Sequence, residues 1–137
     1  MPTVPFNKFN CFVADCKNKI HNLASDQVTV ALSDGAPTAG QTTVGNITQI
    51  AYTNLSARNV TTTSSTQTGG LYKLICQPLT LTASGNVAQF RYVVLYNSTA
   101  ATTPLIGWYD YGSEVNMVNP QTFLINFDTT NGVLTDQ

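Results

Sequence analysis

Charged side chains are scarce in this sequence. Only 9% of its 137 residues are Asp, Glu, Lys or Arg, about a third of the usual quarter, and the formal net charge is -1. Nucleic acids and anionic membranes bind proteins that have a positively charged surface. A chain with this composition does not provide such a surface. We therefore expect neither a nucleic-acid nor a membrane partner.

Long apolar runs are also absent. No stretch approaches the roughly 20 apolar residues of a membrane helix, and the first residues lack the basic and apolar regions of a secretion signal. These absences predict synthesis in a cytoplasm. The three cysteines, Cys11, Cys16 and Cys76, form no CxxC motif, and we expect them to be small buried apolar residues.

Catalytic and cofactor signatures are missing as well. The single histidine, His21, excludes a multi-histidine metal site, and no glycine-rich phosphate-binding motif occurs. Asp110 and Glu114 could form a glycosidase-like carboxylate pair, and Asp128 could add a calcium ligand, but neither has a supporting motif. We expect no enzyme activity, no cofactor and no metal.

Neutral polar residues replace the missing charges. Thr, Asn and Ser make up 42 of the 137 residues, and hydrophobic residues make up 42% of the chain. This length and apolar content suit one compact domain over residues 1–137. The domain should have a surface that is polar without being charged.

The N-terminal region carries the one helical pattern. Residues 1–5 are too rich in proline for a helix and are expected to form an extended arm. Phe6, Phe9, Val13, Cys16 and Ile20 then recur at steps of three and four, which predicts a helix over residues 6–22. His21 is expected to end that helix, where an imidazole favours the negative pole of the helix dipole.

From residue 26 onward the hydrophobic period is two. Strands are predicted at residues 28–32, 60–67, 72–76, 79–83, 90–96, 105–111 and 123–127, whereas residues 46–51 suit either a helical turn or a strand. The strand at 90–96 is apolar on both faces, as in the middle of a core. Asp128 to Gly132 predicts a hairpin that returns Val133 and Leu134 against the preceding strand. The predicted fold is mainly β, an antiparallel, jelly-roll-like β-sandwich over residues 26–137 with one N-terminal helix.

Several blocks of the sequence resemble a widespread group of small structural proteins of tailed bacteriophages. The blocks are residues 6–9 continuing through 15 to 21–23, then 26–32, 36–37, 90–97, 104–112 and 127–132, so the match runs along nearly the whole chain. The group is similar to capsid decoration or cement proteins, which bind in many copies to the outside of a head shell. The resemblance implies no catalytic residue.

The resemblance implies a virion protein on the capsid surface, with the major capsid protein and copies of itself, as a dimer or trimer, as partners. A stiff sandwich and a neutral hydroxyl-rich surface suit such contacts, and many weak contacts add on a symmetric lattice. The residues expected at these contacts lie in the arm, on the helix and in one loop: Pro2, Thr3, Val4, Pro5, Lys8, Lys17, Lys19, Asp34, Gly35, Ala36, Pro37 and Gly40.

Two other functions compete with this interpretation. A tail or baseplate component would need the same rigid, self-associating β domain. A carbohydrate-binding module would use Trp108 and Tyr109 as a platform on which sugar rings stack.

Overall fold

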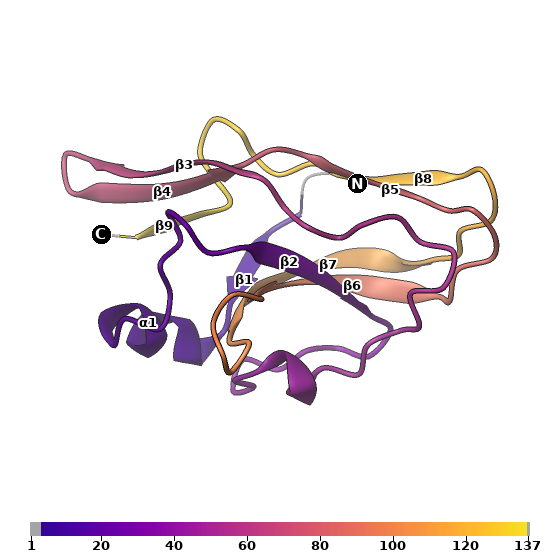
Figure 1. Cartoon of the computed structure of the whole chain (residues 1–137), viewed down its shortest axis with the longest axis horizontal. Coiled ribbons are helices and arrows are strands. Elements are labelled where there is room, and N and C mark those ends of the chain that lie inside the picture. The colour runs from indigo at the N-terminus through magenta and orange to yellow at the C-terminus, as the bar shows by residue number, and fades with distance from the viewer. Residues whose placement is uncertain (1–3, 137) are drawn as a thin grey trace.

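Nine strands, one α-helix and one 3-10 turn build the molecule (Figure 1), whose computed structural model describes residues 4–136. The strands are β1 (Phe6–Lys8), β2 (Val28–Ser33), β3 (Thr62–Thr68), β4 (Leu71–Cys76), β5 (Leu79–Thr82), β6 (Phe90–Asn97), β7 (Leu105–Val115), β8 (Thr122–Ile125) and β9 (Leu134–Asp136). The helix α1 spans Asn10–Lys17, and the 3-10 turn η1 spans Val44–Asn46. The fold is therefore mainly β, as the sequence predicts.

The strands lie in two layers with the main core between them. One layer is a four-stranded antiparallel sheet in the order β1-β7-β6-β2. The other layer is divided into a three-stranded sheet, β3-β4-β9, and a two-stranded sheet, β5-β8, which follow one another along the top of Figure 1. Gln77 and Pro78 separate β4 from β5, where proline cannot donate a hydrogen bond to a sheet. A β-sandwich-like fold is confirmed, and the more specific jelly-roll arrangement stays a prediction.

Strand β6 is central, as its sequence predicts. It pairs with β2 on one side and with β7 on the other. Val93 and Leu95 point into the main core, whereas Val94 belongs to a second cluster on the outer face, together with Phe9 and Leu105. Apolar side chains cover both faces because this strand has packed layers above and below it.

The N-terminal helix is much shorter than predicted. Residues 6–8 form strand β1, paired with β7, and α1 ends at Lys17. Phe9 and Phe12 are the buried aromatic residues here, whereas Val13 is 55% and Ile20 39% exposed. The apolar spacing led to the wrong helix because Phe6 gains more from pairing at the edge of β7, a tertiary contact that local periodicity does not contain.

The prediction for the hairpin at residues 128–132 is also wrong, because the returning strand pairs with a different strand from the one expected. The chain does turn between Asp128 and Gly132, whose φ is +89°. However, β8 ends at Ile125, and β9 pairs with β4 rather than with β8. The residue pair Leu74 and Leu134 brings both side chains into the main core, so burial between the layers determines the partner.

No helix among residues 4–136 combines the length and the apolar character that crossing a bilayer requires.

Candidate functional site

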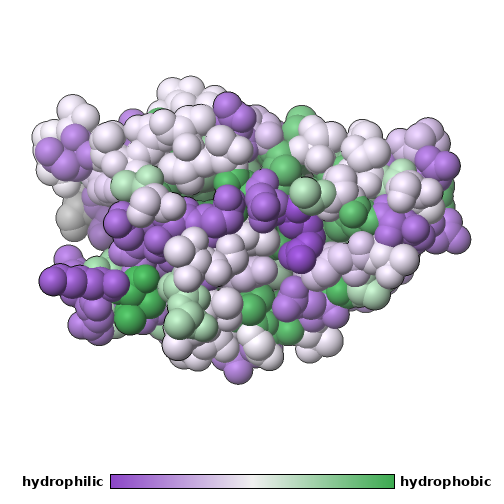
Figure 2. Space-filling model, viewed as in Figure 1, coloured by the Kyte–Doolittle hydropathy of each residue, from purple (hydrophilic) through white to green (hydrophobic). Residues whose placement is uncertain are grey.

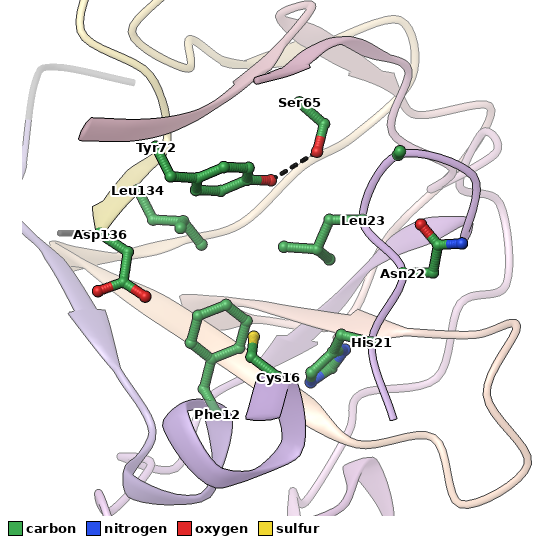
Figure 3. A pocket seen from close by; sticks show the side chains of 10 residues that line it. Phe12, Cys16, His21, Asn22, Leu23, Ser65, Tyr72, Leu134 and Asp136 are labelled. Carbon is green, nitrogen blue, oxygen red and sulfur yellow. Dashed lines mark hydrogen bonds between the residues drawn. The ribbon is translucent and has the colours of Figure 1, made fainter. Parts of the chain in front are cut away.

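A cleft of about 270 Å³ opens at one end of the sandwich. Helix α1 and the connector that follows it form one wall, and the inner face of the β3-β4-β9 sheet forms the other (Figure 3). The apolar lining consists of Phe12 from the helix, Leu23 from the connector, and Tyr72 and Leu134 from the strands. The cleft is therefore mainly apolar, and both layers of the fold contribute to it.

Two hydroxyl groups and a thiol are among the polar groups of the cleft. The hydroxyl groups of Ser65 and Tyr72 lie 2.7 Å apart and form a hydrogen bond. Burial raises the pKa of the Cys16 thiol, and the carboxylates of Asp136 and Asp15 raise it further. A thiol that stays protonated is a poor nucleophile. The Cys16 thiol is therefore not an activated nucleophile.

His21, which lines the cleft, belongs to a buried polar network instead of ending a helix. Its Nδ1 atom lies 3.1 Å from Nδ2 of Asn97, a residue with no exposed surface. The same Asn97 amide donates to a carboxylate oxygen of Asp26 at 2.7 Å. Its Oδ1 atom accepts hydrogen bonds from the backbone N–H groups of Thr99 and Ala100. The network fastens the α1–β2 connector to the end of β6.

His21 is neutral in this environment. An amide N–H can only donate, so Nδ1 of His21 must accept from Asn97. Burial lowers the pKa of His21, although the carboxylates of Asp15 and Asp26 oppose that shift. The prediction that His21 ends a helix is wrong because α1 already ends at Lys17 and the chain folds back onto β6. Its Nε2 atom is buried and has no partner among the described residues.

The lysines expected at contacts lie around the same end of the molecule. Lys8 donates from Nζ to the carbonyl oxygen of Thr135, which joins β1 to β9. Lys17 and Lys19 are exposed at the end of α1, and Lys19 has a φ of +63°. Lys8 and Lys17 are close enough to Cys16 to lower its pKa, against the two aspartates named above. The rim of the cleft therefore carries charges of both signs.

The other expected contact residues are partly placed by the structure. Val4 packs against its own chain's core, and Pro5 is exposed, while Pro2 and Thr3 lie outside the described residues. In the loop, Asp34, Gly35, Ala36 and Gly40 are exposed, whereas Pro37 is buried. The carbonyl oxygen of Ala39 accepts a hydrogen bond from the N–H of Asn10. This loop thus abuts the start of α1, so two of the expected contact segments adjoin in the fold.

The predicted carboxylate groups are tied to separate partners. Asp110 forms a two-pronged salt bridge with Arg91, at 2.9 and 3.2 Å, which lowers the pKa of the carboxyl. Glu114 accepts a hydrogen bond from Gln89. Asp128 accepts from the backbone of Thr130 and Asn131 and so holds its own turn. Among residues 4–136, no three His, Cys, Asp or Glu side chains gather as metal ligands would.

Trp108 and Tyr109 do not form one platform. Successive residues of a strand face opposite sides of a sheet. Trp108 accordingly packs on Phe9 in the outer cluster, with 4.6 Å between ring centroids, whereas Tyr109 lies in the main core and is 6% exposed. The predicted sugar-binding pair is wrong because neighbouring positions in a strand cannot share a surface.

Comparisons with protein families, with curated proteins and with solved structures find no match to this chain.

The cleft and the Asn97 network were not predicted from the sequence. One feature of the sequence could have indicated Asn97. It is a polar residue at the end of a strand that is apolar on both faces, and a buried amide at such a position can hold the loop that follows.

Proposed function

We propose that this protein is a virion structural protein of a tailed bacteriophage and binds the outside of the capsid as a decoration or cement protein. Its partners would be the major capsid protein and copies of itself. The observation that carries the proposal is the combination of a two-layered β-sandwich with a polar surface that is almost free of charge. The resemblance of the sequence to phage structural proteins supplies the location.

A neutral polar surface suits protein partners that are met many times. Most of the face seen in Figure 2 is pale or purple, and green atoms form separate small patches. Hydroxyl and amide groups can exchange water for protein partners without the desolvation cost of an ion. Each contact is weak, but contacts to several capsid subunits add through multivalency. Such a protein would bridge capsid subunits and stabilise the shell.

The first experiment measures the stability of the shell. Heads of the phage that encodes this chain are prepared with and without the protein, and their thermal disruption is followed by light scattering. Ligands that bind only the intact state stabilise it by mass action, so decorated heads should disrupt at the higher temperature. Equal disruption temperatures would refute the decoration role.

A second experiment locates the protein in the particle and counts it. Gold labelling of intact virions should mark the whole head, and the stoichiometry should be on the order of hundreds of copies, because the contacts repeat over a symmetric shell. Label at one pole with a handful of copies would replace the capsid assignment with a tail or baseplate role.

A charge reversal tests the expected contact surface. Lys17→Glu changes an exposed residue at the end of α1, and Lys73→Glu makes the same charge change on β4. Binding to undecorated heads should weaken several-fold for the first variant, as for other charges at an interface rim, and stay unchanged for the second. Equal binding by both variants would exclude Lys17 from the contact.

A further inference from the structure

We propose that strand β3 is the self-association edge of this protein and pairs antiparallel with β3 of a second copy. The pairing would join two β3-β4-β9 sheets into one six-stranded sheet across a two-fold axis. This inference rests on the proposed function, because it names the interface between copies that bridge a shell. Its test measures association in solution and does not involve capsids.

The outer side of β3 is an unprotected sheet edge. On its inner side, β3 pairs with β4 from Thr62 to Thr68. On its outer side, no segment among residues 4–136 forms a ladder or an isolated bridge with it. Every second residue therefore presents a backbone N–H and a carbonyl oxygen outward, which is a template for another strand.

Other edges of the fold are covered, short or charged. The outer side of β2 is covered by the segment from Gln49 to Val60, which donates to and accepts from the β2 backbone. Ser56 bonds the far side of β5 through its N–H and its hydroxyl. Strands β1 and β9 have three residues each, and they carry Lys8 and Asp136. With seven residues, β3 is longer than any of these edge strands.

Strand β3 also lacks the residues that natural proteins use to block edge pairing. Such edges are usually protected by lysine, by proline or by inward-pointing charges. The β3 sequence is Thr-Thr-Ser-Ser-Thr-Gln-Thr, and no charged residue occurs between Arg58 and Lys73. Its one irregularity is a register shift between Thr62 and Ser64, at the start of the strand. The remainder of the edge is regular.

Self-pairing places only compatible side chains opposite one another. A two-fold axis through Ser65 would set Ser64 opposite Thr66 of the second copy, and would bring Thr63 and Thr62, at the irregular start of the strand, near Gln67 and Thr68. Each pair joins hydroxyl or amide groups, and opposed Thr and Ser residues stabilise antiparallel strands. A charged edge would repel its own copy, because a two-fold axis brings like charges together. The neutrality of β3 therefore favours a second copy over a charged partner.

The test introduces charges beside the two-fold axis. In the double variant Ser64→Glu/Thr66→Glu, two pairs of carboxylates would oppose each other across the axis, whereas in the monomer position 66 faces Lys73 of β4. Like charges directly opposite destabilise a pair, so the dissociation constant should rise about tenfold or more. The matched control is Thr80→Glu/Thr82→Glu, which adds the same charges to exposed positions of β5 and should leave association unchanged.

Sedimentation velocity supplies the measurement, since a monomer of 14.7 kDa is readily separated from its dimer. A third variant, Ser64→Lys/Thr66→Lys, should also associate weakly alone but form a mixed dimer with the acidic variant. That rescue cannot arise from a folding defect. A monomeric wild type at about 1 mM, an acidic variant that dimerises as the wild type does, or a mixture without rescue would each overturn the proposal.

The outcomes for the two proposals remain separate. If the acidic variant is monomeric and still stabilises heads at high concentration, decoration does not depend on β3 pairing. If the wild type pairs through β3 and leaves heads unchanged, the capsid role is wrong and the self-association edge remains.

Discussion

The buried imidazole of His21 makes stability depend on pH in a predictable direction. Its Nδ1 atom accepts from the amide N–H of Asn97, so protonation of Nδ1 would set two donors against each other. Asn97 cannot rotate freely to relieve this conflict, because its Oδ1 holds two backbone N–H groups and its Nδ2 also donates to Asp26. Burial adds to the conflict and lowers the pKa of His21 in the folded state.

The size of the effect follows from proton linkage. An unfolded histidine has a pKa of about 6.5. Above that pH the His21 imidazole is neutral in both the folded and the unfolded protein, so it does not make stability depend on pH. Below that pH the unfolded protein binds a proton that the folded protein does not bind, and the free energy of unfolding falls as pH falls. The decrease between about pH 7.5 and about pH 5.5 is at most about 1.4 kcal/mol, and it stops once the folded-state pKa is passed.

The assay is urea unfolding at several pH values above about 5, where ordinary Asp side chains do not titrate. Fluorescence of Trp108, the single tryptophan, reports the transition. The matched variant is His21→Asn, whose side-chain oxygen can replace Nδ1 as the acceptor for Asn97 but cannot be protonated. The wild type should lose stability relative to this variant as pH falls through about 6.5. Parallel pH profiles of the two proteins would refute the reasoning.

Three further changes test the packing. Asn97→Ala removes the acceptor of two backbone N–H groups and should lower the free energy of unfolding in urea by about 3 kcal/mol or more. The control Asn126→Ala, at an exposed site, should lower it little. Similar losses for the two variants would contradict the network. In Gly107→Ala, the new Cβ would clash with the ring of Phe6 and would lie 2.6 Å from the carbonyl oxygen of Asn7. This clash should destabilise the fold by about 1–3 kcal/mol and speed amide exchange in β1; unchanged exchange there would count against the close approach. Cys76 has no exposed surface, so a thiol reagent should modify it only when the protein unfolds. The half-buried Cys11 and Cys16 should react earlier. Equal modification rates for the three thiols would show that the core opens locally.

Period-two patterns predicted most of the strands because burial alternates along a strand in the same way in any sandwich. The strands at β2, β4, β5 and β6 lie within a few residues of their predicted positions. Pairing partners are a different matter. The turn at Asp128 depends on local contacts, since that side chain accepts hydrogen bonds from the backbone N–H groups of Thr130 and Asn131. The pairing of β9 with β4 buries Leu74 and Leu134 in the core, and it also requires a close approach, because a Cβ on Gly132 would lie 2.8 Å from the carbonyl oxygen of Leu74.

The N-terminal segment shows why a single period can mislead. Phe6 and Phe9 are three residues apart, which fits a helix, but they serve two different surfaces. Phe6 packs against the main core from strand β1, and Phe9 fills the outer cluster beside Trp108. Gly107 leaves the room that the Phe6 ring occupies. The sequence separation between Gly107 and Phe6 keeps this contact out of reach of any local pattern.

The cleft and the Asn97 network were missed for a related reason. Each is assembled from segments distant in sequence, namely α1, its connector and the strands β3, β4, β6 and β9. In contrast, the exposed character of β3 could be predicted, because a run of Thr and Ser has no apolar side chain to bury on either face. Exposure is a property of one segment, whereas a site is a property of several.

The scarcity of charge connects the exclusions drawn from composition with the edge at β3. A low number of charged residues leaves few lysines and glutamates to protect the sheet edges. The fold covers β2 with the segment from Gln49 to Val60 and part of β5 with Ser56, which protects these edges by backbone pairing. The same chain leaves the neutral strand β3 uncovered, and this strand is regular from Ser64 to Thr68. An edge that is neither charged nor covered is free to pair with another strand, and on the proposed capsid surface the strand nearest to it would belong to another copy of this chain.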